Sequence, residues 1–211
     1  MTAAEITQPN RKPIWLLITL FFAPLAAAFV LYYGLEGWRP PGSTNNGDLI
    51  TPPRPLPELA LPLVQGGVQG GAQGGTSDAK LLHGKWTLIY VGDGTCDTRC
   101  REALTHIRQT RLALGDDMNR VRRVFIATAA CCDQAYLDQE QPGLVTVRAD
   151  AASGAQLLSV FPQDAGLPVQ RGGRIYIADP LGNLMMSYPP TAKPKALLED
   201  LKKLLRLSHI G

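Results

Sequence analysis

Four cysteines carry the chemistry that this sequence most clearly suggests, and they form two pairs along the chain. Cys96 and Cys100 are four residues apart, whereas Cys131 and Cys132 are adjacent. A separation of four places two sulfurs on one side of a helical turn, where they can form a disulfide or hold one soft metal ion. Cys96 and Cys100 are therefore the first candidates for thiol-disulfide or metal chemistry.

The N-terminal segment decides the compartment in which these cysteines work. Residues 14–33 contain no charged side chain and are long enough for a helix of about 30 Å, the thickness of a bilayer's hydrocarbon core. Arg11 and Lys12 precede them, so the positive-inside tendency leaves residues 1–13 in the cytoplasm and the following domain in the periplasm. We expect a single-pass inner-membrane anchor. The alternative is a signal peptide cleaved near residues 26–28, but the apolar stretch continues beyond that point.

Composition divides the rest of the chain. Residues 34–57 are rich in proline and glycine and predict an extended tether. Residues 58–211 suffice for one domain with its own core, and the Gln-Gly-Gly repeats within residues 65–75 predict an inserted flexible loop. The net charge of +3 is spread along the chain, so we expect no binding to nucleic acid.

Hydrophobic patterns in the domain alternate between those of strands and those of helices. Apolar runs of strand length cover residues 86–91, 121–129, 144–147, 174–178 and 184–188. Helical patterns cover residues 98–114, 133–139, 154–161 and 193–207. In the first helix we expect Leu104, Ile107 and Leu112 on one side. A turn at residues 179–183 makes the last two strands antiparallel, so a mixed sheet covered by helices on both faces is expected.

This arrangement places all four cysteines at one edge of the sheet, because parallel strands end at the same edge, where α/β proteins commonly bind or react. We expect Cys96 at a helix N-terminus, which favours the thiolate, and more exposed than Cys100. Cys96 is then the nucleophile or first ligand, and Cys100 the resolving thiol or second ligand. One of Cys131 and Cys132 is expected to approach Cys96 and complete a three-sulfur site. The alternative is that the cysteines form structural disulfides in an oxidising compartment.

The other polar residues near the cysteines have simpler interpretations. Asp93 and Asp97 are expected to be turn and N-cap residues, the alternative being that they favour a bound cation. His83, His106 and His209 are expected to lie away from the cysteines as solvated or structural residues.

Several segments resemble the Sco/SenC family of cytochrome c oxidase assembly proteins, within the thioredoxin-like superfamily. These segments are residues 54–63, 81–92 and 174–188, together with the motif Cys-Asp-Thr-Arg-Cys at residues 96–100. Sco proteins carry Cys-x-x-x-Cys after the first core strand. The resemblance implies a thioredoxin-like three-layer fold, Cu(I) as a cofactor held by thiolates, and a respiratory oxidase subunit or another assembly factor as partner.

The sequence departs from the Sco pattern at two places. Asp97, Thr98 and Arg99 occupy the motif where Sco proteins usually have prolines, and Arg171 falls where the copper-binding histidine is expected. A guanidinium has no lone pair to give a metal. We expect a Sco-like assembly factor that uses thiol-disulfide or Cu(I)-thiolate chemistry. The alternatives are a general periplasmic thiol-disulfide oxidoreductase and a non-catalytic thioredoxin-like interaction domain.

Overall fold

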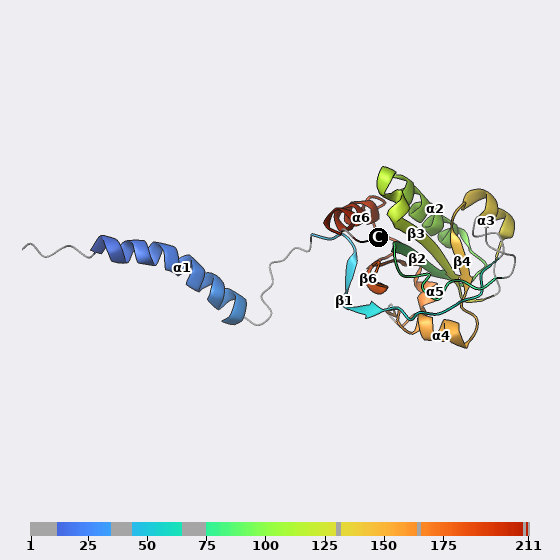
Figure 1. The fold of residues 1–211 in the computed structure, drawn as a ribbon, viewed down its shortest axis with the longest axis horizontal. Helices are drawn as coiled ribbons and strands as arrows, with labels where there is room; N and C mark the ends of the chain where they lie inside the picture. The colour runs from blue at the N-terminus through green and yellow to red at the C-terminus, as the bar shows by residue number, and fades with distance from the viewer. Residues whose placement is uncertain are drawn as a thin grey trace, which may run out of the picture. The chain divides into compact units, whose positions relative to one another are not determined.

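The computed structural model describes residues 12–34, 44–64, 75–129, 132–163, 166–208 and 210. The chain divides into two compact units, residues 1–44 and residues 45–211. The described part of the first unit is dominated by a single helix, and the second unit is an α/β domain (Figure 1).

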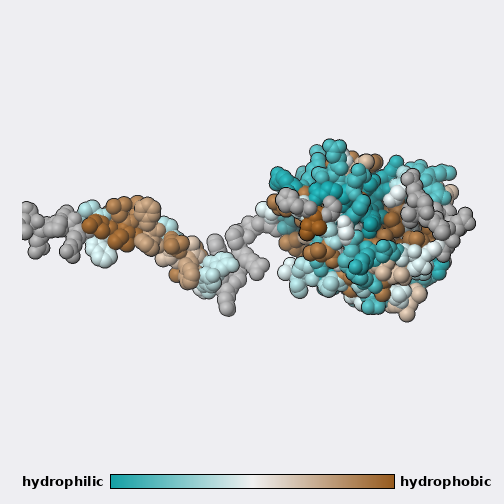
Figure 2. Space-filling model, in the orientation of Figure 1, coloured by the Kyte–Doolittle hydropathy of each residue, from teal (hydrophilic) through white to brown (hydrophobic). Residues whose placement is uncertain are grey.

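Helix α1, Lys12–Gly34, covers the expected apolar segment. Residues 13–34 of this helix are long and apolar enough to cross a membrane, and Figure 2 shows hydrophobic residues along most of its visible face. Pro24 lies inside the helix, as a membrane-spanning helix tolerates.

A mixed sheet of six strands forms the centre of the described domain, in the order β1-β6-β5-β2-β3-β4. The strands are β1 Asp48–Pro55, β2 Trp86–Gly92, β3 Val121–Ala127, β4 Val145–Arg148, β5 Ile175–Ala178 and β6 Asn183–Tyr188. β2 runs parallel to β3, with Trp86 opposite Val121 and Gly92 opposite Ala127, and β3 runs parallel to β4. β5 pairs antiparallel with β6, as expected from the turn between them, and it also pairs antiparallel with β2. Strands β2 and β3 therefore end together at one edge.

Helices cover both faces of this sheet. They are α2 Thr98–Leu112, α3 Gln134–Glu140, α4 Ala152–Leu158, α5 Val169–Gly172 and α6 Ala196–Leu207, with a 3₁₀ helix η1 at Gly115–Arg120. Leu88 and Tyr90 of β2 belong to the apolar cluster under α2 and α6, whereas Ile89 and Val91 belong to the cluster on the opposite face. This alternation is the period of a strand buried on both sides. The expected three-layer α/β architecture is confirmed (Figure 1).

The expected tether is wrong in its C-terminal part, because residues 48–55 form β1 at the edge of the sheet. The prolines of this stretch argue against a helix or a central strand, and β1 is neither, because it lies at the edge of the sheet. An edge strand pairs on one side only, so residues without an N–H group fit where the backbone faces away from β6. The register between β1 and β6 also shifts between Leu49 and Arg54.

Helix α2 differs from the expectation at its C-terminal end. It stops at Leu112, which is 54% exposed rather than buried. The buried residues of α2 are Cys100, Leu104, Ile107 and Thr110. They follow a helical spacing of three and four, and Leu112 is rotated off that stripe. The short helix α5 was not expected at all, and residues 65–74 of the expected loop lie outside the described residues.

Candidate thiol-disulfide site

Cys96 and Cys100 are joined by a disulfide, with an S–S distance of 1.99 Å and a Cα–Cα distance of 4.9 Å. Cys96 immediately precedes Asp97, the N-cap residue of α2. The Asp97 carboxylate accepts a hydrogen bond of 3.0 Å from the backbone N–H of Cys100, one of the donors that a helix N-terminus leaves unpaired. The motif thus places both sulfurs at the start of α2, beyond the end of β2, as the sequence predicted.

Both cysteines are buried, each with 3% of its surface exposed. The expectation that Cys96 is more exposed than Cys100 is therefore wrong. Both belong to the apolar cluster that also contains Tyr90 of β2 and Leu137 of α3. Cys96 has φ of 48°, in the left-handed region that residues other than glycine seldom adopt. The spacing of the cysteines could not predict this left-handed turn, on which the burial of Cys96 depends.

Asp93 and Asp97 have the turn and cap roles expected of them. Asp93 accepts hydrogen bonds from the backbone N–H of Thr95 at 3.1 Å and from its hydroxyl at 2.8 Å, which closes the turn after β2. Burial raises the pKa of Tyr90 to about 12, and the negative charges of Asp97 and Asp93 act in the same direction. The Tyr90 hydroxyl, next to this loop in the chain, therefore stays protonated at neutral pH.

Arg101 is a site residue that the sequence analysis missed. Its Nε donates to the carbonyl oxygen of Cys96 at 3.3 Å, and its Nη2 donates to Oδ2 of Asp133 at 3.0 Å. Its guanidinium also lies over the ring of Tyr136, 4.5 Å from the ring centre. Arg101 thus connects the first cysteine motif to the beginning of α3. The only sequence signal was its position directly after Cys100.

The second cysteine pair is described only in part, because Cys131 lies outside the described residues. Cys132 is disulfide-bonded and packs against the apolar cluster that contains Cys96 and Cys100. The ends of β2 and β3 are joined by the N–H of Thr128, which donates to the carbonyl of Gly92 at 2.9 Å. β3 ends at Ala127, earlier than expected. A three-sulfur site that includes Cys131 or Cys132 stays a prediction.

Within the described part of the chain, no group of three or more histidine, cysteine, aspartate and glutamate side chains could hold a metal ion. His106 bonds through Nε2 to the carbonyl oxygen of Pro194 at 2.8 Å, and Nε2 of His83 lies 4.0 Å from Glu58. These two histidines therefore have structural surroundings away from the cysteines, as predicted, and His209 lies outside the described residues. The donors at the motif that suit Cu(I) are the sulfurs of Cys96 and Cys100 once they are reduced.

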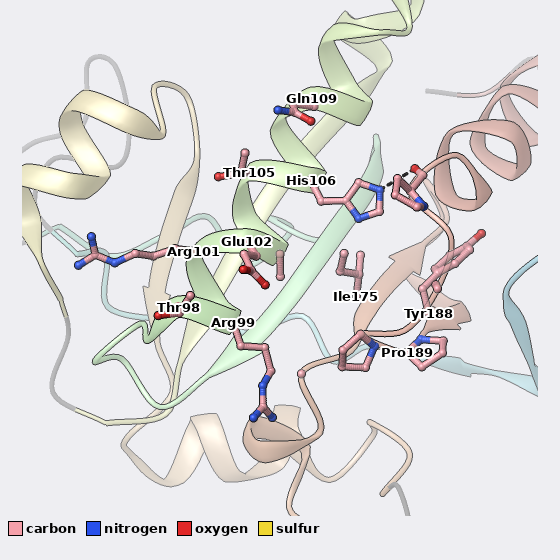
Figure 3. A pocket seen from close by; sticks show the side chains of 15 residues that line it. Thr98, Arg99, Arg101, Glu102, Thr105, His106, Gln109, Ile175, Tyr188 and Pro189 are labelled. Atoms are coloured by element: carbon pink, nitrogen blue, oxygen red, sulfur yellow. Dashed lines mark hydrogen bonds between the residues drawn. The ribbon is translucent and has the colours of Figure 1, made fainter.

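A groove of about 520 Å³ begins at the disulfide motif and runs along α2 (Figure 3). Thr98, Arg99, Glu102 and His106 line it from α2. The opposite wall is lined by four residues that follow β6: Pro189, Pro190, Ala192 and Pro194. The Arg99 side chain extends towards the end of α5, where its Cδ is 2.9 Å from the position that a Cβ on Gly173 would take. The groove combines charged side chains with an apolar wall that includes Ile175 and several prolines.

The part of the chain that forms this site matches a known protein family. The model of a family described as a transmembrane-like, thioredoxin-like, C-terminal domain matches residues 86–208, more than half of the chain. The chain belongs to this family. No curated protein matches the sequence.

Solved structures of Sco proteins have the same fold as this thioredoxin-like domain. Apo Sco1 from Thermus thermophilus has a TM-score of 0.57 at 14% identity, covering 76% of this chain and 97% of its own. ScoI from Bradyrhizobium japonicum with copper bound has a TM-score of 0.51 at 23% identity, covering 69% and 98%. Yeast Sco1 with copper bound has a TM-score of 0.54 at 15% identity, covering 79% and 96%. Such identities show the fold alone, and the expected thioredoxin-like fold is confirmed.

Arg171 lies in α5 of this thioredoxin-like domain, in a short helix that contacts β2. Its side chain is exposed, and its guanidinium cannot ligate a metal. A third donor for a metal at Cys96 and Cys100 therefore has to come from a residue other than Arg171.

Proposed function

We propose that this protein is a membrane-anchored, periplasmic, Sco-like factor that assists assembly of cytochrome c oxidase. Its chemistry takes place at Cys96 and Cys100, by thiol-disulfide exchange or by transfer of Cu(I) held between the two thiolates. The observation that carries the proposal is the disulfide at the first turn of α2, at the edge where the parallel strands β2 and β3 end. The Sco proteins that share the fold include two solved with copper bound.

In the exchange reaction, the reduced protein passes two electrons to a disulfide on its partner. The Cys96 thiolate attacks one partner sulfur, and the other partner sulfur leaves as a thiolate that takes up a proton. Cys100 then loses its proton and attacks the sulfur of Cys96, which releases the second partner thiol and forms the Cys96–Cys100 disulfide. Cys96 is assigned the first attack because it precedes α2, whereas movement of Cys100 would unwind the first turn of the helix.

In the copper reaction, Cu(I) is cargo that the reduced thiolates of Cys96 and Cys100 hold and release. Thiolates are soft ligands that favour Cu(I) over harder ions. Arg171 occupies the position where the copper-binding histidine of Sco proteins is expected, and it cannot serve as a ligand to Cu(I). We propose that Cys131 or Cys132 supplies a third sulfur ligand instead. This role requires reduction of the disulfide at Cys132 as well.

The proposed partner is a membrane-bound oxidase subunit or another assembly factor. Helix α1 would hold the domain at the outer face of the inner membrane, near such a partner. The groove along α2 opens directly beside the motif and offers a place for a partner segment that carries the reacting cysteine or copper site.

Titration of the full-length protein with Cu(I) tests the copper reaction. The protein is purified in detergent, reduced, and titrated under anaerobic conditions. We expect one Cu(I) per chain, and loss of this binding in both Cys96→Ser and Cys100→Ser. In cells that lack the protein, we expect lower cytochrome c oxidase activity, restored by the wild type but not by Cys96→Ser. Normal oxidase activity in the deletion strain contradicts the assembly role.

A general thiol-disulfide oxidoreductase is the second candidate. It is favoured because the arginine at position 171 cannot bind a metal ion. The Cys100→Ser variant separates the two, because it cannot resolve a mixed disulfide formed at Cys96. Capture of many periplasmic proteins, with no Cu(I) binding by the wild type, favours the general oxidoreductase. If strong reductants fail to open the Cys96–Cys100 disulfide in the folded protein, the motif is structural and the domain is an interaction module.

A further inference from the structure

We propose that Arg101 is a positioning residue for the Cys96–Cys100 pair, and that it makes the disulfide equilibrium of this pair depend on the segment beginning at Asp133. The proposal rests on the thiol-disulfide function proposed for the pair. It concerns a residue that lies outside the Cys-x-x-x-Cys motif and that does not itself react.

Arg101 is held on three sides, and one of these contacts reaches the motif. Its Nε bonds to the carbonyl oxygen of Cys96 at 3.3 Å, and its Nη2 bonds to Oδ2 of Asp133 at 3.0 Å. The ring of Tyr136 lies under the guanidinium, and the Tyr136 hydroxyl donates to the carbonyl oxygen of Arg101 at 3.4 Å. The planar guanidinium can make these contacts together, which a lysine ammonium cannot reproduce.

The bond to Cys96 falls on a residue with an unusual backbone. Cys96, at φ of 48°, is the only residue other than glycine with a positive φ in the described part of the chain. A residue keeps such a conformation only where its surroundings fix it. In the oxidised protein the link to Cys100 does so. After reduction that link is gone, and the bond from Arg101 remains to hold Cys96 beside Cys100.

Holding the two thiols together favours disulfide formation. Two reacting groups fixed in the right geometry behave as if they were at a high effective concentration. Without Arg101, the reduced loop is free to relax to an ordinary backbone conformation, and this gain in freedom stabilises the dithiol relative to the disulfide. We therefore expect loss of Arg101 to make the Cys96–Cys100 disulfide easier to reduce.

Asp133 links this effect to the second cysteine pair. Its Oδ1 caps α3 by accepting from the N–H of Tyr136 at 3.1 Å, while its Oδ2 binds Arg101. Asp133 also follows Cys132 directly in the chain. A rearrangement of this segment therefore changes the position of Arg101, and through Arg101 it changes the support of Cys96. The side chains of Arg101 and Asp133 are 46% and 43% exposed, so the ion pair itself is partly screened and its loss should have the smaller effect.

The test measures the equilibrium of the Cys96–Cys100 disulfide with glutathione in the full-length protein in detergent. Thiols are alkylated after equilibration, and mass spectrometry of the peptides distinguishes Cys96 and Cys100 from Cys132. Measurements at pH 6 lower the thiolate fraction of both cysteines, so that the charge of Arg101 contributes less than it does at neutral pH. The measurement uses neither copper nor a partner protein. Its outcome therefore does not depend on whether the protein acts in oxidase assembly.

We expect Arg101→Gln to lower the equilibrium constant for disulfide formation about tenfold, which corresponds to about 30 mV. Arg101→Lys should give a smaller shift, because its ammonium can still donate to the carbonyl oxygen of Cys96 or to Asp133. Asp133→Asn, which retains an oxygen to cap α3, should lower the constant about threefold. The matched control is Arg108→Gln: Arg108 also connects α2 to α3, by donating to the carbonyl oxygen of Glu140 at 3.0 Å, but it bonds to neither cysteine. The control should stay within twofold of the wild type.

A purely structural role for Arg101 gives a different result. Arg101→Gln and Arg108→Gln would then lower the melting temperature by similar amounts and leave the glutathione equilibrium unchanged, which overturns the proposal. A shift in Arg101→Gln without one in Asp133→Asn overturns the part assigned to Asp133. If Arg101→Gln does not fold, an unchanged equilibrium in Arg101→Lys and Asp133→Asn together counts against the proposal.

Discussion

The carboxylate of Asp200 in α6 accepts a hydrogen bond of 2.9 Å from the backbone N–H of Gly47, which ties the end of the domain to its beginning. The same oxygen accepts from the N–H of Asn46 at 2.7 Å and from the hydroxyl of Tyr188 at 3.0 Å. Asp200 is 2% exposed, so these donors replace the water that a carboxylate otherwise requires. The contact fixes the residues that lead into β1.

Removing this carboxylate should destabilise the domain strongly. Asp200→Ala leaves two backbone N–H groups and the Tyr188 hydroxyl without their acceptor, and we expect a loss of about 3 kcal/mol in the free energy of unfolding. Urea unfolding of the full-length protein measures this. The control is Glu199→Ala: the Glu199 carboxylate accepts an exposed side-chain bond from Asn46, so its removal should cost less than about 0.5 kcal/mol. Equal losses in the two variants contradict the assignment.

Tyr90 should make the domain less stable at alkaline pH. Its pKa is raised from 10.0 to about 12, mainly by burial, so folding favours the neutral hydroxyl. Its stabilising effect is therefore complete below pH 10 and is lost as the pH rises towards 12. Between pH 9.5 and pH 11, the wild type should lose about 1 kcal/mol more unfolding free energy than Tyr90→Phe. Identical pH dependence in the two proteins contradicts this prediction.

The sequence alone predicted those helices and strands that leave a pattern in neighbouring residues. The apolar run in β2 and the turn between β5 and β6 predicted these strands correctly, because burial on both faces and a tight turn leave local patterns in the sequence. β1 was missed because its prolines argue against a central strand, and only the sheet order reveals that this segment forms an edge strand.

The site was predictable in position but not in its contacts. The spacing of Cys96 and Cys100 predicted that their sulfurs can meet, and the disulfide confirms this, although Cys96 precedes the N-cap of α2 and is not part of a helical turn. The burial of Cys96 depends on a left-handed turn and on packing against residues distant in sequence. The contact between Arg101 and Asp133 joins positions 32 residues apart, so it exists only because α2 and α3 meet in the folded domain.

Gly173 should be needed both for the backbone at the end of α5 and for the groove. Its φ is 62°, and a Cβ there would lie 2.9 Å from Cδ of Arg99 and 3.1 Å from Cγ of Pro190. Gly115 is a matched control, with φ of 61° and no atom within 4 Å of the added Cβ. Both alanine variants should lose about 1 kcal/mol of unfolding free energy from the backbone. Gly173→Ala should in addition displace Arg99, which we expect to slow exchange with a partner, and equal exchange rates in the two variants contradict this.

Helix α1 should keep the protein in the membrane with its domain outside. The full-length protein should remain in the membrane fraction after alkaline extraction, and a protease added to the periplasmic side should cleave the domain. Deletion of residues 14–33 should leave the protein in the cytoplasm, because no other helix in the described part of the chain meets the criteria for a span. A soluble periplasmic protein whose N-terminus follows Ala28 contradicts the anchor and supports a cleaved signal peptide.

The second cysteine pair should add one sulfur to the Cu(I) site. Cys132 packs against the cluster that contains Cys96 and Cys100, and Arg171 has no lone pair to serve as the third ligand. X-ray absorption of the reduced, Cu(I)-loaded protein should therefore count three sulfur neighbours. If Cys132 is the ligand, Cys132→Ser should reduce the count to two while Cys131→Ser leaves it at three, and the reverse identifies Cys131. Two sulfurs in the wild type, unchanged in both variants, end the three-sulfur proposal and leave Cys96 and Cys100 as the whole site.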